Sequence, residues 1–161
     1  MKKREFPFFN LAIREARLAG KRGEIPVGAV IIEAKTGNVL AKAGNLIEQN
    51  KDPTAHAEIL AIRAASRLIG SPRLINCDLY VTLEPCPMCA AAISFARIRR
   101  LYFGAFDKKS GGIEHGPKIY SHPTCHHIPE VYGGINETVC GLLLKRFFLK
   151  KRKKMVDDTL K

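Results

Sequence analysis

The stretch DLYVTLEPCPMCAAAISFARIRRLYFGA, residues 78–105, decides the fold of this 161-residue chain. Its first part, residues 78–84, predicts a β-strand, and its last part, residues 99–105, predicts a second strand. The residues between them, 87–98, predict a helix that begins with a proline. A helix that joins two strands is typical of a layered α/β domain in which at least part of the sheet is parallel.

The chain before this stretch continues the alternation of helices and strands. Apolar residues at helical spacing predict a first helix that ends near Gly20. IPVGAVIIEA, residues 25–34, predicts a strand, and KTGN turns it into a hairpin with VLAKAGN, residues 39–45. A second helix is expected from near Ala55 to the GSP at residues 70–72.

The chain after this stretch divides into a long loop and a closing helix. Residues 106–134 are predicted to be irregular, and they hold four of the five histidines. Loops of that length are usually functional or mobile. A last helix is expected to begin near Asn136, a good N-cap residue, and to form with its basic tail the segment 136–161. The length predicts one domain that spans residues 1–161.

The formal net charge of +12 is the least ordinary feature of the composition. It comes partly from KKR at residues 2–4 and from KRFFLKKRKK at residues 145–154. A basic excess of this size favours a polyanionic partner, RNA or DNA before a membrane. A solvated surface that keeps the protein soluble is the alternative explanation.

The cysteines and the apolar runs indicate an intracellular protein. Five cysteines at uneven spacing do not form the framework of a secreted disulfide protein. Pro7 and Asn10 interrupt the apolar run near the start, so no signal-peptide core is expected. No stretch approaches the roughly 18–20 apolar residues of a membrane span. We therefore expect a cytoplasmic location and no membrane partner.

Two cysteines and a histidine have the spacing of a metal site. Cys86 and Cys89 are three residues apart in the first turn of a predicted helix, so both sulfurs lie on one helix face. The positive end of the helix also favours thiolates, which bind metals. His56 lies at the start of another helix that follows a strand, and such helix starts gather along one sheet edge. The three residues can therefore converge on Zn²⁺ and leave its fourth position open, as in a catalytic site.

Glu58 follows His56 after a single alanine. Side chains at i and i+2 of a regular helix face apart, so His56 has to lie at the helix start if both serve one site. A zinc ion lowers the pKa of water from about 15.7 towards about 7, and a free carboxylate in reach can carry the proton. Two alternatives stay open: a structural zinc closed by Cys77 as fourth ligand, and an exposed helix carboxylate at Glu58.

These motifs resemble those of a known enzyme family. His-x-Glu followed by Pro-Cys-x-x-Cys is the signature of zinc-dependent nucleobase deaminases. The chain resembles the bacterial tRNA-specific adenosine deaminases, within the cytidine/deoxycytidylate deaminase superfamily, over nearly its whole length. The runs that carry this resemblance are PVGAVI, DPTAHAEILAIR, LYVTLEPCPMCAAAI, RIRRLYFGAFDKKSG and FFLKKRKK.

The resemblance implies a fold, an activity and a set of site residues. The fold is a three-layer α/β/α domain with a mixed central sheet of about five strands. The activity is deamination of adenosine to inosine at the wobble position of a tRNA anticodon stem-loop, by a homodimer with one Zn²⁺ per subunit. The matching positions are His56, Cys86 and Cys89 for zinc, Glu58 for acid/base catalysis, and Asn45, Ile25, Asp107, Lys108 and Lys109 for substrate.

Each substrate position also has a simpler explanation. Asn45 can be a turn or capping residue, Ile25 a core residue, and Asp107 the cap of a loop after a strand. The segment CHHIPE, residues 125–130, departs from the pattern of this family. We expect a surface or RNA-facing loop there, and Cys125, His126 and His127 also allow a second metal site.

Two rival functions remain compatible with the motifs. One is a deaminase of free bases or nucleosides, such as guanine or cytosine, on the same core. The other is a non-catalytic zinc module that binds RNA. Neither a basic terminal helix nor a net charge of +12 is required by the first rival.

Overall fold

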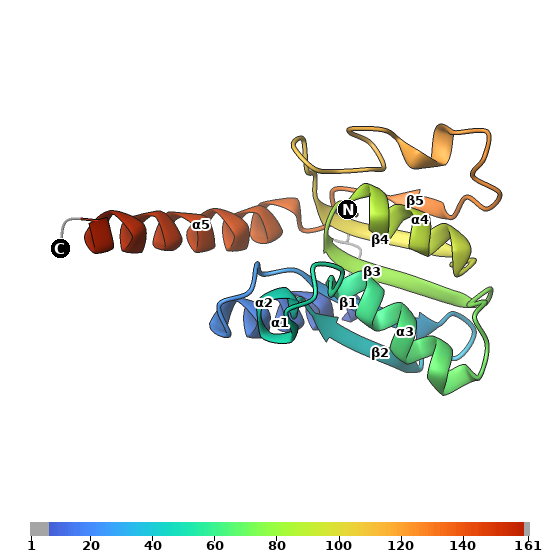
Figure 1. Ribbon diagram of the computed structural model, residues 1–161. Helices are drawn as coiled ribbons and strands as arrows, with labels where there is room; N and C mark the ends of the chain where they lie inside the picture. The colour runs from blue at the N-terminus through green and yellow to red at the C-terminus, as the bar shows by residue number, and fades with distance from the viewer. Residues whose placement is uncertain (1–6, 160–161) are drawn as a thin grey trace, which may run out of the picture.

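The computed structural model describes residues 7–159 and has a five-stranded sheet between two layers of helices (Figure 1). The elements in chain order are α1 (Pro7–Lys21), β1 (Gly28–Glu33), β2 (Val39–Gly44), α2 (Ile47–Asn50), α3 (Ala57–Ile69), β3 (Cys77–Leu83), α4 (Pro87–Phe95), β4 (Arg100–Ala105), the 3-10 turn η1 (Ile119–Ser121), β5 (Glu130–Tyr132) and α5 (Glu137–Thr159). The basic run at residues 2–4 lies outside the described residues.

The sheet is mixed, with the strand order β2-β1-β3-β4-β5. β1 pairs antiparallel with both β2 and β3, whereas β3–β4 and β4–β5 are parallel. β2 and β3 therefore run in the same direction, because each is antiparallel to β1. The first main helix after each of them, α3 and α4, consequently starts near the same edge of the sheet. The expected α/β/α fold with a mixed sheet of about five strands is confirmed.

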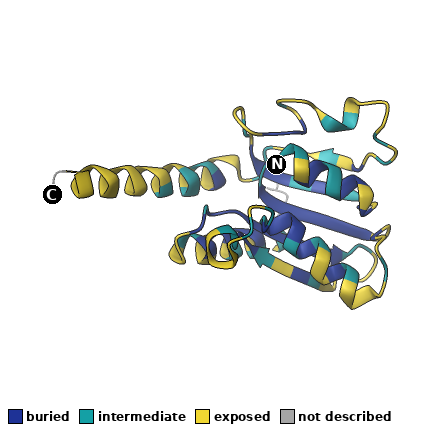
Figure 2. Cartoon of the chain, viewed as in Figure 1, coloured by how far each residue is buried: buried dark blue, intermediate teal, exposed yellow. Residues whose placement is uncertain are grey.

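Helices cover both faces of the sheet and bury its strands. α3 and α4 lie on one face, where Leu79 and Val81 of β3 join Ile93 of α4 in one apolar cluster. α1 and the first part of α5 lie on the other face, where Phe9 and Tyr80 belong to a second cluster. The alternation of Leu79, Tyr80 and Val81 between the two clusters follows the two-residue period of a strand. Figure 2 shows the central strands as almost wholly buried.

α1 and α5 approach the sheet closely at two glycines. A Cβ atom on Gly28 would lie 2.1 Å from the carbonyl oxygen of Ala12 and 2.5 Å from the backbone nitrogen of Ala16. A Cβ atom on Gly104 would lie 2.6 Å from the Sγ of Cys140. Cys140 itself is 1% exposed, which confirms the expectation of a small core residue on the closing helix. Close backbone approach is a recurring reason for glycine in a strand.

Several predicted boundaries were wrong by a few residues. The first strand begins at Gly28 instead of residue 25, and α4 ends at Phe95 because Arg97 has a φ of 58°. The loop 106–134 contains the strand β5, which is only three residues long and was not predicted. Asn136 has a φ of 51°, unlike the extended backbone usual at an N-cap.

The outer part of α5 projects from the body of the domain (Figure 1). Its residues are exposed on all sides, whereas the first turns of the helix pack against the sheet (Figure 2). No helix within residues 7–159 has the length and apolar character needed to cross a membrane.

We predict that Gly28→Ala lowers the free energy of unfolding by about 2–3 kcal/mol, because the new methyl group meets backbone atoms of α1 that cannot move away individually. Gly141→Ala is the matched control, since a Cβ atom there meets nothing within 4 Å. In the helix interior it should stabilise by about 0.5–1 kcal/mol. Urea unfolding followed by circular dichroism measures both, and equal midpoints for Gly28→Ala and wild type would refute the packing argument.

Candidate active site

The start of α3 is held in place by its neighbours. The Oδ1 of Asp52 accepts hydrogen bonds from the backbone nitrogen and the hydroxyl of Thr54, at 2.8 and 2.7 Å. The first helical N–H, of Ala57, donates to the Oδ1 of Asn45 at 2.9 Å. His56 therefore occupies the N-cap position with extended backbone angles, φ −71° and ψ 150°. Its side chain is turned away from the regular helix and is free to meet a second element.

The start of α4 presents the two cysteines. Cys86 is the N-cap, with φ −68° and ψ 169°, and Pro87 follows as the first helical residue. Proline suits this position because its missing N–H would have no partner within the helix. Cys89 lies in the same first turn and is fully buried. Both sulfurs lie on one side of the helix, as the spacing predicted.

The structure brings His56, Cys86 and Cys89 together in metal-binding geometry. The Nδ1 of His56 lies 3.7 Å from the Sγ of Cys86 and 3.5 Å from the Sγ of Cys89. Zinc bonds of about 2.0–2.1 Å to nitrogen and about 2.3 Å to sulfur give tetrahedral N···S edges of about 3.6 Å. The three donors therefore fit a zinc ion. Among residues 7–159 they form the only such group of His, Cys, Asp and Glu side chains.

Cys77 does not provide a fourth ligand. It lies at the first residue of β3, whereas Cys86 follows the last residue, Leu83, after a short turn. Six residue steps along a strand separate its two ends by roughly 20 Å. Cys77 is also absent from the group that includes Cys86 and Cys89. The alternative of a structural zinc closed by Cys77 is therefore wrong.

Glu58 is a buried carboxyl group beside these donors. The residue is only 4% exposed, so the alternative of an exposed helix carboxylate is wrong. Burial raises the pKa of Glu58 to about 7, because the charged form loses its hydration. A group with this pKa exists in both protonation states near neutral pH. Such a pKa suits a proton carrier.

The thiol of Cys86 is prepared for deprotonation. Hydrogen bonds from Cys89, which has the larger effect, and from His56 lower the pKa of the Cys86 thiol to about 4. The thiolate is the form of cysteine that binds a metal. The hydrogen bond to Cys86 also raises the pKa of His56, so each of the two groups favours the charged form of the other.

A pocket of about 400 Å³ opens over this cluster. This volume is within the usual range for small-ligand sites. Seven of the nine predicted site residues line it: Ile25, Asn45, His56, Glu58, Cys86, Asp107 and Lys109. Cys89 lies buried in the wall below, and Lys108 is exposed and does not belong to the lining.

Asn45 and Asp107 have structural roles as well as a place in the lining. Asn45 accepts the N–H of Ala57 with its Oδ1, which leaves its Nδ2 for a ligand in the pocket. The Oδ1 of Asp107 accepts the N–H groups of Lys109 and Ser110, at 3.0 and 2.9 Å, and so caps its own loop. The capping explanations are therefore correct for both residues, and they leave room for a role toward substrate.

About half of the residues that line the pocket were not predicted from the sequence. The additional residues are Val27, Ile47, Leu83, Glu84, Phe106, Ser110, Leu144 and Phe148. Leu144 and Phe148 come from α5, about 90 residues after His56 in the chain. The only signal for them in the sequence is the pair Phe147 and Phe148 within the basic run. Glu84 directly precedes the cysteine motif but looked like the end of a strand.

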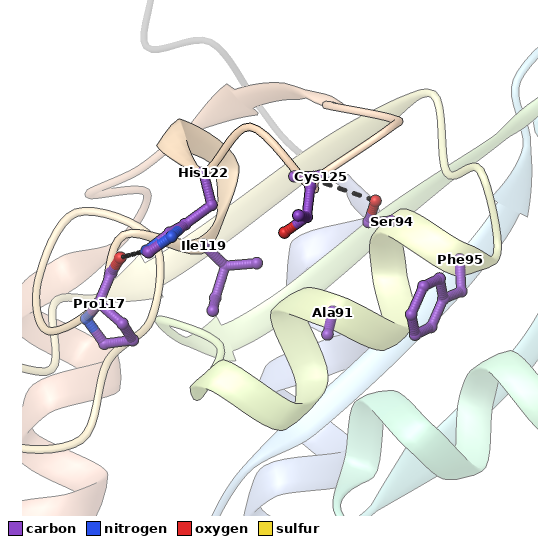
Figure 3. Close-up of a pocket in the computed structure, with 8 residues that line it drawn as sticks. Ala91, Ser94, Phe95, Pro117, Ile119, His122 and Cys125 are labelled. Atoms are coloured by element: carbon purple, nitrogen blue, oxygen red, sulfur yellow. Dashed lines mark hydrogen bonds between the residues drawn. The ribbon is translucent and has the colours of Figure 1, made fainter.

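The segment that departs from the family pattern packs against α4 (Figure 3). The hydroxyl of Ser94 donates to the carbonyl oxygen of His127 at 2.6 Å and lies 3.4 Å from the Sγ of Cys125. The Nε2 of His127 lies 2.6 Å from the carbonyl oxygen of Ile98. Cys125, His126 and His127 form no metal-binding group within the described chain, so the second metal site is wrong.

An open three-donor site with a free buried carboxyl group beside it defines a zinc-dependent hydrolytic enzyme. Residues 2–105 match the cytidine and deoxycytidylate deaminase zinc-binding region. The chain therefore belongs to the cytidine and deoxycytidylate deaminase family, and the zinc cofactor follows from the family and from the donor geometry.

The chain is similar to several characterised proteins of this family. The tRNA-specific adenosine deaminase of Agrobacterium fabrum is 54% identical over 151 residues, which cover 94% of this chain and 96% of that protein. A structure from a study of A-to-I editing by tRNA:A34 deaminases superposes with a TM-score of 0.84 at 54% identity, and covers 87% of this chain and 100% of its own. Guanine deaminase from Bacillus subtilis has a TM-score of 0.63 at 31% identity, covering 89% and 94%.

We predict that Glu58→Gln stabilises the metal-free protein above pH 7. In the wild type the folded-state pKa of Glu58, about 7, exceeds its unfolded value of 4.5. The folded state holds the proton more tightly, so stability falls as pH rises from 4.5 to 7 and stays low above. Glutamine removes this loss, which amounts to about 3 kcal/mol. Urea unfolding with chelator at pH 5 and pH 8 tests it, and a constant difference between the proteins would contradict it.

Proposed function

We propose that the protein hydrolyses adenosine to inosine, with release of ammonia, at the wobble position of a tRNA anticodon loop. The observation that carries this proposal is the three-donor cluster with the buried Glu58 beside it. The 54% identity to a tRNA-specific adenosine deaminase over nearly the whole chain supports the choice of substrate. We also propose a cytoplasmic location, because tRNA is the proposed substrate.

The chemical roles follow from the donor set and from the burial of Glu58. His56, Cys86 and Cys89 would hold one Zn²⁺ ion per subunit. Bound zinc supplies a Lewis acid that lowers the pKa of water towards about 7. Glu58 would take one proton from water and pass it to ring nitrogen N1 of adenine while the remaining hydroxide adds to C6. It would then move the proton of the new C6 hydroxyl group to the amine, which leaves as ammonia when the C6–N6 bond breaks. A pKa of about 7 allows the same carboxyl group to accept and donate at neutral pH.

The walls of the pocket suit a single flipped-out base. Ile25, Val27, Leu83 and Phe106 provide apolar surface around the space above the cluster. We propose that Asn45 contacts the bound nucleotide through its Nδ2. A pocket of about 400 Å³ has the size of a small-ligand site. Enzymes that deaminate a nucleobase act on a base that is unpaired or flipped out, and anticodon loop bases are unpaired.

The basic residues near the pocket suit an RNA backbone. Lys109 lines the pocket, and Lys108 is exposed on the same loop next to Asp107. We propose that Asp107 lies near the ribose and that both lysines lie near its phosphates. Leu144 and Phe148 of α5 line the pocket. Positions 145–154 of the same helix include seven lysine and arginine residues. This surface favours an RNA substrate over a free base.

The direct test is incubation of the zinc-loaded protein with an anticodon stem-loop that bears adenosine at the wobble position. Conversion of amine to carbonyl raises the RNA mass by about one dalton and releases ammonia. We expect conversion of this RNA and none of free guanine, cytosine or adenosine. Deamination of guanine alone would favour the activity of the Bacillus subtilis relative, and no turnover on any substrate would favour a non-catalytic zinc module.

We predict that Glu58→Gln retains one zinc per chain but loses inosine formation by about 10²–10⁴-fold or more, because its amide cannot carry the proton. Metal analysis of the purified variant and the mass assay measure the two effects. Asp78→Asn, a buried carboxylate paired with Arg99 outside the pocket lining, serves as the control and should remain active. Substantial activity in Glu58→Gln would remove the assigned role.

We also propose that two copies associate through the face formed by α3 and α4. Phe95 at the end of α4 is 79% exposed, which is unusual for a phenylalanine. It borders a hollow of about 300 Å³ with Ile119 and Cys125 (Figure 3) and a second hollow with Ile59 and Ile62 of α3. A second copy of the chain can fill these hollows, in agreement with the homodimer that the family resemblance implies.

We predict that light scattering gives twice the 17.9 kDa mass of one chain and that Phe95→Asp gives a monomer. The charge would have to be buried without a partner in the dimer. Leu68→Asp is the matched control, because Leu68 is 65% exposed on α3 but borders neither hollow. A monomeric wild type, or a dimer that tolerates Phe95→Asp, would contradict the proposed face.

A further inference from the structure

Glu84 is a buried carboxylate between β3 and the cysteine turn. Its side chain has no exposed surface, and it is two residues away from Cys86. It does not belong to the group of metal-binding donors. A buried carboxylate needs hydrogen-bond donors to offset its lost hydration, and here the donors identify what the residue does.

All the donors to Glu84 come from one segment of the chain. Its Oε1 accepts the N–H groups of Ile113, Glu114 and His115, at 3.2, 2.8 and 3.0 Å. Its Oε2 accepts the N–H of Asp107 at 2.9 Å and lies 2.8 Å from the Nδ1 of His115. The carboxylate of Glu84 is therefore hydrogen-bonded to both ends of the loop 107–115.

The loop lies directly against Glu84 and the start of α4. A Cβ atom on Gly111 would lie 2.5 Å from the Oε1 of Glu84, and one on Gly112 would lie 2.7 Å from the nitrogen of Pro87. The N–H of Gly112 also donates to the carbonyl oxygen of Pro85 at 2.8 Å. Only residues without a side chain allow this approach, so the backbone of the loop packs directly against the cysteine turn.

The other side of the same loop forms a wall of the active-site pocket. Asp107, Lys109 and Ser110 line the pocket, and so does Phe106 just before them. The ring of Phe106 meets the ring of His115 edge-on, with 6.0 Å between their centres. The backbone of the loop has little regular structure of its own, so the contacts with Glu84 largely determine where this wall stands.

We propose that Glu84 is a positioning residue that holds the pocket wall 106–115 at a fixed place relative to the metal-binding turn. The expected effect on KM rests on the proposed function. The expected effect on the position of the loop rests on the contacts of Glu84 alone. Glu84 belongs to the pocket lining, but its side chain is fully buried and it is not one of the metal-binding donors, so it acts through the loop. It sets the distance between the loop that contacts the nucleotide and the cluster that performs the chemistry.

The experiment compares zinc-loaded Glu84→Gln with Asp78→Asn. Asp78 is a matched control, because it is a buried carboxylate on β3, the strand that Glu84 directly follows, and it pairs with Arg99 at 2.7 Å outside the pocket lining. Glutamine retains the shape of Glu84 but offers an N–H₂ group where an N–H donor now points, so two donors face each other.

Hydrogen exchange read by mass spectrometry should show about tenfold faster exchange in peptides that cover residues 107–116 of Glu84→Gln, and unchanged exchange there in Asp78→Asn. Zinc content should stay at one per chain in both. The KM for the anticodon stem-loop should rise about tenfold or more in Glu84→Gln, with a smaller change in kcat.

Unchanged exchange at 107–116, an unchanged KM or loss of zinc in Glu84→Gln would each overturn the proposal. If this variant does not fold, His115→Ala removes one donor at a half-buried position, and about threefold faster exchange in the same peptides is then expected. A wild type that does not act on the RNA refutes the proposed function, whereas the exchange comparison still decides the role of Glu84.

Discussion

The active site depends on the meeting of two helix starts at one edge of the sheet. β2 and β3 point the same way because both are antiparallel to β1, so α3 and α4 begin near each other. Each helix places a ligand at its N-cap, where the backbone is extended and the side chain turns out of the helix. His56 thereby comes within 3.7 Å of both cysteines, although about 30 residues separate them in the chain.

The starts of the helices α3 and α4 carry the metal-binding residues. Two segments that are held by buried carboxylates form part of the pocket around them. Glu84 holds the loop on one side of the pocket. On the other side Glu24, which is 2% exposed, accepts the N–H groups of Glu48 and Gln49 at 3.2 and 2.9 Å and so fixes α2. Both walls therefore keep their positions without belonging to the sheet, which gives a preformed site for a flipped-out base.

The features that local patterns determine were predictable from the sequence, and those that depend on distant contacts were not. The main helices, the first four strands and the convergence of His56 with Cys86 follow from periodicity, spacing and strand direction. The strand β5 was not predicted, because three residues are too few to show the two-residue alternation of a strand. Leu144 and Phe148 escaped because only the packing of α5 against the sheet brings them to the pocket. Glu84 escaped because its partners lie 23 to 31 residues away.

The most direct test of this account is a crystal structure of the zinc-loaded protein, with the metal located by anomalous scattering at the zinc edge. We predict a tetrahedral ion with bonds of about 2.0–2.1 Å to His56 and about 2.3 Å to Cys86 and Cys89, and a fourth ligand from solvent. An oxygen of Glu58 should lie within hydrogen-bond distance of that solvent ligand without touching the metal. A fourth protein ligand, or a Glu58 carboxyl group bound to the ion, would contradict it.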